Sequence, residues 1–261
     1  MQTRESRGPI LMPVALVAIG VILLLNNFLF LGDFDAPALA PLLLVAAGAV
    51  VLLRGDLTAG GKPRTFSITR GSVESVTLEI SAGEVDVEVR RLHRDGRLIA
   101  GQFAPQSRPE LRTEGTHAHL IMRRARTPWL SFADWQTALA TDLPWQIHVS
   151  TNLGQVNLDL SGLIVQDVVA GTGFGDIHFV CPDEALERVS LRSAFGAIHV
   201  VTPPGQAARI HVKTGRLFTA RVDSNRYQRV EPGVYEALDA SPDSPVVEIT
   251  VRGTFGDAYL A

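Results

Sequence analysis

The pattern of apolar and polar positions repeats every 21 residues between residues 147 and 215. Three copies follow one another without a gap, and a fourth begins in the same way. The predicted repeats are 147–167, 168–188, 189–209 and 210–230. Within each copy, apolar and polar residues alternate along two short stretches, as in strands with one buried face. A fixed period of about 20 residues is typical of units that stack on their copies, so the pattern predicts an all-β solenoid with 21-residue rungs.

Five apolar positions recur in each copy and are predicted to point into a continuous core. In the first three copies they are Ile147, Val149, Leu153, Val156 and Leu158; Val168, Ala170, Phe174, Ile177 and Phe179; and Val189, Leu191, Phe195, Ile198 and Val200. Rungs of such a fold lie about 4.8 Å apart, so equivalent side chains should stack. The residues between these positions are expected to face solvent.

A glycine recurs between the two strands of each unit, where a tight corner favours a residue that readily adopts positive φ. The predicted structural turn glycines are Gly83, Gly154, Gly175, Gly196 and Gly256. Residues 76–89 show the same strand, glycine, strand pattern and predict a degenerate first rung. Residues 249–261 resume it as a closing rung after a polar excursion. The solenoid domain is therefore predicted over residues 65–261.

Two segments depart from this alternation. In the fourth copy, a one-residue bulge near Thr214 is needed to turn Leu217, Ala220 and Val222 toward the core. Residues 127–145 interrupt the strand pattern, and we expect one or two helical turns packed over the end of the stack. Their aromatic residues are Trp129, Phe132, Trp135 and Trp145. No convergent polar set accompanies these rings, which favours a structural cluster over a ligand-binding one.

Two apolar stretches precede the β region. Residues 9–31 carry no charge, and residues 36–53 form a second apolar run that Arg54 closes. A membrane-spanning helix needs roughly 20 apolar residues, so the pair predicts a two-helix transmembrane hairpin over residues 1–55. A linker rich in glycine and proline follows at 56–64. A cleaved signal peptide is the alternative, but the first run is long for its apolar region and a second run comes at once.

The positive charges around these runs predict an orientation. Arg4 and Arg7 precede the first run, Arg54 and Lys62 follow the second, and the short acidic loop has none. Positive charge is retained on the cytoplasmic side. We therefore expect a cell-membrane protein with two spans, both termini and the β-domain being cytoplasmic.

Composition narrows the function classes. The formal net charge of −3 gives no basic excess of the kind that nucleic-acid phosphates require. The single cysteine, Cys181, excludes an internal disulfide framework and a zinc site built from several cysteines.

Two histidines are the only candidates for a metal site. His178 and His199 lie one period apart and should stack on adjacent rungs of the outer face, about 5 Å apart. Asn157 occupies the equivalent place one rung earlier and is a poor third ligand. We therefore expect no metal site, and this pair is only a weak candidate for one. Instead we expect a ladder of exposed imidazoles whose protonation responds to pH.

No other constellation indicates catalysis. Asp159, Asp176 and Asp257 lie at turns or outer positions, and their spacing supplies no close pair for acid–base chemistry. We expect no catalytic residue, no cofactor, no small-molecule substrate and no enzymatic activity.

Short motifs in both parts of the chain carry a family resemblance. Those of the apolar region are Gly8-Pro9-Ile10-Leu11, Leu24-Leu25-Asn26-Asn27 and Ala40-Pro41-Leu42-Leu43-Leu44, and those of the repeats are Leu160-Ser161-Gly162-Leu163 and Gly173-Phe174-Gly175-Asp176. The first set resembles the LiaI/LiaF-type transmembrane region. The second is similar to the LiaF-like (cell wall-active antibiotics response) domain and the related "putative-adhesin" toast-rack β-domains. The resemblance implies an envelope-stress membrane protein, in the best-known cases one that restrains a sensor kinase.

Three functions follow as hypotheses. The leading one is a membrane-anchored, non-enzymatic regulator or scaffold of the bacterial cell-envelope stress response that binds other membrane proteins. The alternative is a self-associating structural or adhesin-like β-solenoid protein, because the open ends of a solenoid expose unpaired strand edges. A polysaccharide-acting enzyme is the third.

Overall fold

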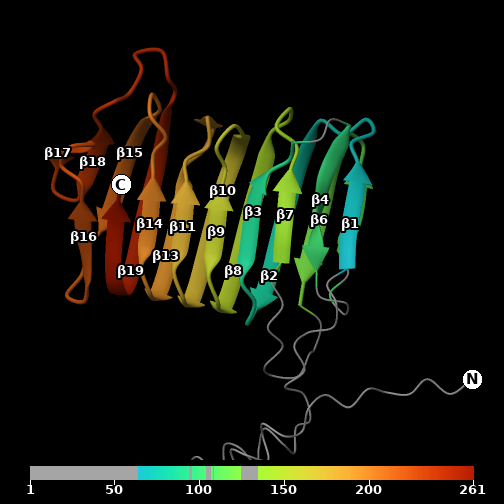
Figure 1. The fold of residues 1–261 in the computed structure, drawn as a ribbon, viewed down its shortest axis with the longest axis horizontal. Coiled ribbons are helices and arrows are strands. Elements are labelled where there is room, and N and C mark those ends of the chain that lie inside the picture. Colours follow the sequence, from blue (N-terminus) through green and yellow to red (C-terminus); the bar gives the residue numbers. More distant parts are fainter. Residues whose placement is uncertain (1–63, 94–95, 104–106, 108, 125–134) are drawn as a thin grey trace, which may run out of the picture. The chain divides into compact units, whose positions relative to one another are not determined.

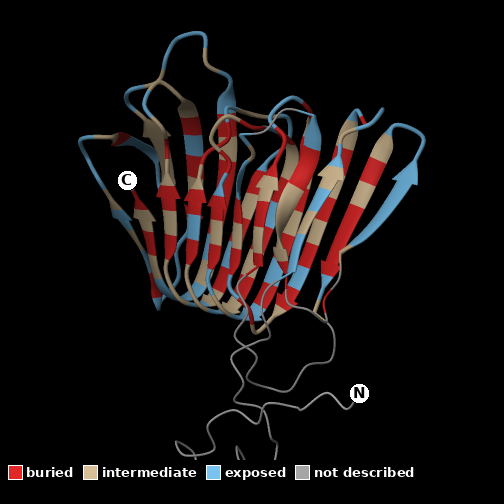
Figure 2. Ribbon diagram, turned by 45° about the vertical axis from the view of Figure 1, so that its right-hand side comes forward, coloured by how far each residue is buried: buried red, intermediate tan, exposed pale blue. Residues whose placement is uncertain are grey.

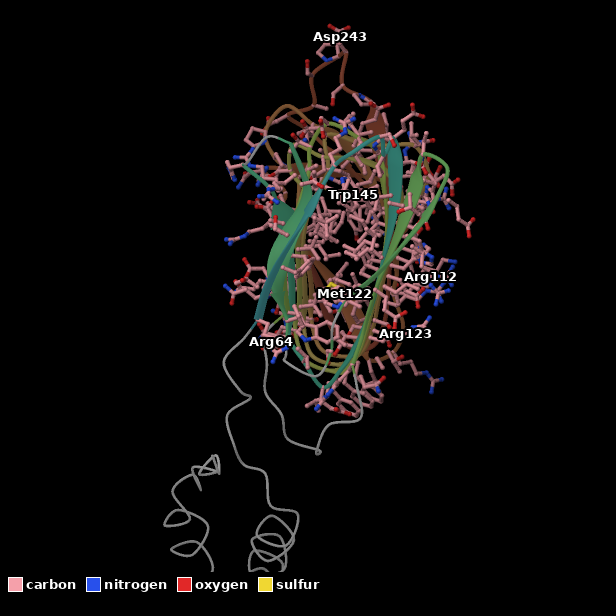
Figure 3. All side chains as sticks on the ribbon, turned by 90° about the vertical axis from the view of Figure 1, so that its right-hand side faces the viewer. Arg64, Arg112, Met122, Arg123, Trp145 and Asp243 are labelled. Carbon is pink, nitrogen blue, oxygen red and sulfur yellow. The ribbon has the colours of Figure 1, made fainter. Side chains whose placement is uncertain are left out.

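All regular structure in the described part of the chain is β. The computed structural model describes residues 64–93, 96–103, 107, 109–124 and 135–261. Their strands form two facing layers, joined at the bottom of Figure 1 by the turns of successive rungs. Apolar side chains such as Met122 and Trp145 fill the space between the layers (Figure 3). The prediction of an all-β fold is confirmed.

In the repeats, the chain runs toward the corner in one layer and away from it in the other. The first layer contains β2 (Ser75–Gly83), β5 (Glu110–Glu114), β6 (His117–Arg123), β8 (Trp145–Leu153), β10 (Ile164–Phe174), β12 (Glu184–Ala185), β13 (Val189–Phe195), β15 (Ala207–Lys213), β17 (Tyr227–Glu231) and β18 (Val234–Ala237). The second contains β1 (Arg64–Thr69), β3 (Val87–Arg91), β4 (Arg97–Phe103), β7 (Trp135–Leu139), β9 (Val156–Asp159), β11 (Ile177–Val180), β14 (Ile198–Val201) and β16 (Phe218–Val222). The long β19 (Val246–Leu260) turns the corner and pairs in both layers.

The described residues hold no helix that could cross a membrane. The predicted hairpin, 1–55, lies outside the described residues, as does the predicted linker, 56–64, except for Arg64, which begins β1.

Strands of the repeats pair in parallel at the predicted offset. Ala170 lies between Val149 and Leu191 in the first layer. Ile177 lies between Val156 and Ile198 in the second. The 21-residue register is therefore confirmed, and the alternation of buried and exposed residues along each strand is visible in Figure 2.

The spatial order of the rungs differs from the predicted one at both ends. Residues 249–261 do not close the stack, because β19 lies between β13 and β15 and places Ile249 between Val189 and Ile210. Likewise, residues 76–89 are not the first rung, because β2 pairs with β6 on one side and with β8 on the other. At the β19 end a long connection lets the chain return and insert a rung, whereas at the β2 end the short connection between β7 and β8 passes over the rung of β2 and β3.

The segment that was expected to be helical contributes a strand. β7 covers Trp135–Leu139, and Trp135 and Trp145 are fully buried. The Trp145 indole donates a 2.8 Å hydrogen bond to the Ala140 carbonyl. Residues 125–134 lie outside the described part. A structural role for these two rings agrees with the prediction, whereas the expected helical turns are wrong at 135–139.

Twelve of the fifteen predicted core positions are buried. The other three are exposed: Leu153 by 48%, Phe174 by 54% and Phe195 by 41%. In each rung, the last residue that faces inward before the corner carries a hydroxyl group: Thr151, Thr172 or Ser193. The chain turns directly after this residue, so the alternation of inward and outward positions ends there. Thr172 illustrates the arrangement, because its buried hydroxyl donates to the Gly154 carbonyl of the preceding rung at 3.2 Å. Leu217, also predicted inward, is 58% exposed, and Phe218 fills the core instead.

Four of the five predicted turn glycines form one column at the corner. Gly154, Gly175, Gly196 and Gly256 all have positive φ, and a Cβ at Gly175 or Gly196 would overlap the carbonyl oxygen of the glycine one rung away. Gly83 also has positive φ, at 69°. Gly83 is not part of the column. On that side of Gly154, the backbone of Val85 takes the place that a glycine occupies in the other rungs.

The ends of the first layer carry charge. β5 and β17 are its edge strands, and both pair antiparallel with their single neighbour. Their exposed side chains include Glu110, Arg112, Glu114, Arg229 and Glu231. Charged edge strands oppose further strand pairing. The second layer ends at β1 and β16.

Candidate functional site

The outer face of the second layer carries a row of stacked rings. One outward side chain from each of five adjacent rungs forms this histidine row: Asn157, His178, His199, Tyr259 and Arg221. The imidazoles of His178 and His199 stack with centroids 4.4 Å apart, and Tyr259 stacks on His199 at 4.7 Å. The Arg221 guanidinium lies 5.7 Å from the centroid of the tyrosine ring. The predicted stacking of the two histidines is confirmed.

A carboxylate joins the two imidazoles. The ligand atoms of Asp176, His178 and His199 all lie within 4.8 Å of one another. Asp176 Oδ1 accepts a 2.7 Å hydrogen bond from the Ala197 backbone N–H. Two imidazoles and a carboxylate are a donor set that suits Zn²⁺, with solvent completing a tetrahedral site. Sequence reasoning named only the histidines, because Asp176 lies at the corner directly before β11, where the alternation of the strand does not apply.

The pKa of His199 lies below its ordinary value of 6.5. Partial burial in the row is the main cause, repulsion from a protonated His178 adds to it, and the Asp176 carboxylate opposes it. Neutral imidazole, the form that binds metals, is favoured at this position.

This lowered pKa predicts a pH-dependent stability. As pH falls below about 6.5, the unfolded chain takes up the His199 proton before the folded chain does, so the folded state loses stability. His199→Gln should therefore shrink the loss of stability on acidification, measured as the urea midpoint of the purified full chain at pH values on either side of that value. His93→Gln, which removes an exposed histidine outside the row, is the control. An unchanged pH dependence in His199→Gln would contradict the assignment.

A second row runs along the corner where the rungs turn. It consists of exposed apolar side chains, here called the corner strip: Leu153, Phe174, Phe195, Phe255 and Leu217. Phe195 stacks on Phe174 at 4.6 Å and on Phe255 at 4.5 Å, with ring planes within 6° of parallel. The rings are therefore held in one rigid line, partly open to solvent.

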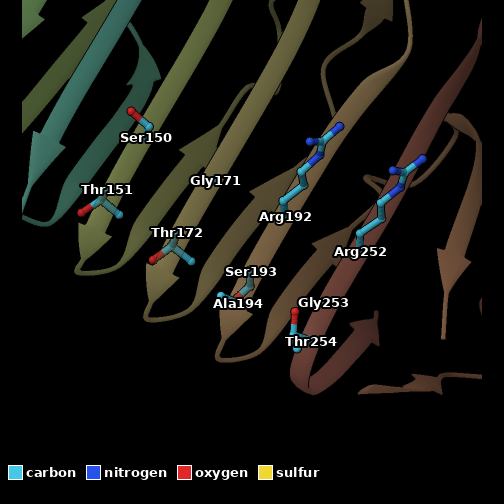
Figure 4. Close-up of a pocket in the computed structure, with 10 residues that line it drawn as sticks. All are labelled: Ser150, Thr151, Gly171, Thr172, Arg192, Ser193, Ala194, Arg252, Gly253 and Thr254. Atoms are coloured by element: carbon cyan, nitrogen blue, oxygen red, sulfur yellow. The ribbon is translucent and has the colours of Figure 1, made fainter. Parts of the chain in front are cut away.

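A basic row lies beside the corner strip on the outer face of the first layer. Arg192, Arg252 and Lys213 are in register on three adjacent rungs. The two arginines border a shallow hollow of about 400 Å³, which forms because Gly171 has no side chain at the equivalent place in β10. Figure 4 shows both guanidinium groups beside the small residues of the corner. Such a surface can bind anionic groups.

Comparisons with known proteins identify the domain. Residues 60–197, more than half of the chain, match the family model described as the N-terminal domain of toast_rack, DUF2154. No curated protein matches. Among solved structures, a "putative cell adhesion protein" from Clostridium sporogenes is 15% identical over 76% of this chain and 99% of its own, with a TM-score of 0.62. At this identity the likeness concerns the fold alone.

A weaker structural likeness involves a second named adhesin. The "putative adhesin" from Bacteroides fragilis is 9% identical over 78% of this chain and 99% of its own, with a TM-score of 0.28. This score is too low to support an argument.

Proposed function

The chain belongs to the toast-rack family, and from this premise we propose that it is a non-enzymatic, adhesin-like binding protein of the cell envelope. The supporting observation is the surface of the stack, where rigid rows of equivalent side chains run across successive rungs. Such rows suit an extended partner. The name of the Clostridium sporogenes protein with the same fold is consistent with this proposal.

The carboxylates of the stack support a non-enzymatic role. Asp159 accepts hydrogen bonds from the Ser161 backbone and hydroxyl. Asp257 bonds to the Thr219 hydroxyl and pairs with Arg221, and these contacts lower its pKa. A general acid needs a raised pKa, so Asp257 is unsuited to that role.

A regulatory role is the second candidate. It rests on the LiaI/LiaF-type resemblance of residues 1–54 and on the predicted two-span hairpin, which offers small and polar residues for contact with other membrane helices. In this form of the proposal, the protein is a cell-membrane scaffold with a cytoplasmic β-domain that restrains a partner such as a sensor kinase. The charged edge strands β5 and β17 favour a different protein as the partner over end-to-end polymerisation.

Recovery of tagged copies from cells distinguishes the two candidates. Two differently tagged full-length chains are expressed together, extracted in detergent and captured through one tag. An adhesin-like, self-associating protein should bring down the second tag. Extracts that are mixed only after lysis control for association in detergent. Absence of the second tag, together with stoichiometric capture of another membrane protein, would favour the regulator and contradict self-association.

A further inference from the structure

The corner strip is an apolar surface of unusual regularity. Its members are 37–58% exposed, yet they form one continuous line instead of being scattered. Contiguous exposed apolar side chains mark interaction surfaces. Because the three phenylalanine rings are already stacked, no side-chain ordering is needed when a partner covers them.

The charges beside the strip indicate an anionic partner. Arg192, Arg252 and Lys213 form no ion pair with any residue that the structure describes. Equivalent positions on neighbouring rungs lie about 4.8 Å apart, so these like charges repel one another unless an anion lies over them.

The opposite edge of the domain carries many carboxylates. Asp159, Asp183 and Asp223 lie at or shortly after the ends of second-layer strands, and Asp239 and Asp243 lie in the connection between β18 and β19. Figure 3 places Asp243 at one edge and Arg64 and Arg123 at the other. These carboxylates disfavour contact of the far edge with an anionic surface.

The chain also enters the domain at the edge with the corner strip. β1 is antiparallel to β4, β4 is antiparallel to β7, and β7 is parallel to β3. Arg64 therefore lies where the strands of the second layer begin, directly after the corner. The predicted spans end at Leu53, and the ten residues between them and Arg64 reach at most roughly 35 Å.

We propose that the corner strip and the basic row dock the β-domain on the surface of an anionic lipid bilayer. The phenylalanines enter the interfacial region, and the arginines and lysine bind lipid phosphates. Apolar burial and attraction to anionic lipid add together in such contacts. The inference rests on the membrane anchorage that the second candidate function includes, and it adds that the β-domain contacts the bilayer through its corner and is not held by the linker alone.

Depth-sensitive fluorescence tests the proposal with the full chain in proteoliposomes. A cysteine that replaces exposed Thr254, beside the strip, is labelled with an environment-sensitive dye, and Asp243→Cys reports on the far edge. Native Cys181 should stay unlabelled, because burial raises the pKa of its thiol to about 12. Vesicles of phosphatidylcholine and phosphatidylglycerol carry a nitroxide lipid as quencher.

We expect quenching at position 254 to exceed that at 243 by about threefold or more, and to fall when phosphatidylglycerol is omitted. Phe174→Ser with Phe195→Ser, or Arg192→Gln with Arg252→Gln, should reduce it in a similar way. These side chains are exposed at the surface, and unchanged urea midpoints would verify that the variants fold. Equal quenching at the two positions, or quenching indifferent to both pairs of variants, would overturn the proposal.

Flotation separates this inference from the anchorage on which it rests. If the chain floats with the vesicles while position 254 stays unquenched, docking is refuted and anchorage stands. If the chain does not float, anchorage itself fails, and the inference falls with it. Self-quenching of the dye at 254 that rises with protein density, without quenching by lipid, would identify a second copy as the occupant and would also refute docking.

Discussion

Gly175→Ala is expected to destabilise the β-domain by about 2–4 kcal/mol, although it adds a single methyl group. Gly175 has a φ of 139°, a conformation that residues with a Cβ rarely adopt. The added Cβ would also overlap the backbone carbonyl of Gly154 on the adjacent rung, and backbone cannot rotate away as a side chain can. The free energy of unfolding, from urea titration followed by tryptophan fluorescence, measures the effect.

Gly171→Ala is the matched control. Gly171 lies in the same rung, its φ is not positive, and a Cβ there would meet only the Arg192 carbonyl oxygen, at 3.9 Å. Such a substitution stabilises a protein by roughly 0.4–1 kcal/mol, because it restricts the unfolded chain. The two variants should thus differ in sign. Equal effects would mean that the glycine column is not required for the close stacking of the corners.

The period of the sequence predicted the register because each rung repeats the same requirement. A residue such as Ile177 must be apolar in every copy, since the rungs above and below bury it. The same logic predicted the stacked histidines. It did not find Asp176 as their neighbour, because the bend after Gly175 determines where the carboxylate points, and alternation alone does not describe a bend.

The corner is also where the core prediction was wrong. Leu153, Phe174 and Phe195 are apolar, so pattern reasoning placed them inside, whereas the structure turns inward the hydroxyl residues Thr151, Thr172 and Ser193. These hydroxyls donate to backbone carbonyls that the tight corner would leave without a partner. A polar inner position and an apolar outer one reverse the usual rule, and that reversal is what creates the corner strip.

The order of the rungs could not be predicted from the repeats. Nothing in the period requires that consecutive copies be adjacent. The excursion between β16 and β19 contains the hairpin of β17 and β18, which covers the outer edge of β15. Its length allows the chain to return and insert β19 between the third and fourth repeats.

Ile177→Asp should have the largest effect of any single substitution considered, a loss of roughly 4 kcal/mol or more. Ile177 is fully buried and lies at the centre of the second layer, between Val156 and Ile198. A carboxylate there would lose its hydration, and the apolar residues around it offer no hydrogen-bond donor. Urea unfolding of the purified full chain measures the loss, with the fluorescence of buried Trp135 and Trp145 as the signal.

The neighbouring substitution His178→Asn is the control for this prediction, because His178 projects from the same strand toward solvent. It should change stability by no more than about 1 kcal/mol. The cost of Ile177→Asp should also shrink as pH falls, since burial raises the pKa of a carboxyl group and protonation removes its charge. Comparable losses in the two variants, or a cost for Ile177→Asp that does not depend on pH, would contradict the assignment of inward and outward faces on β11.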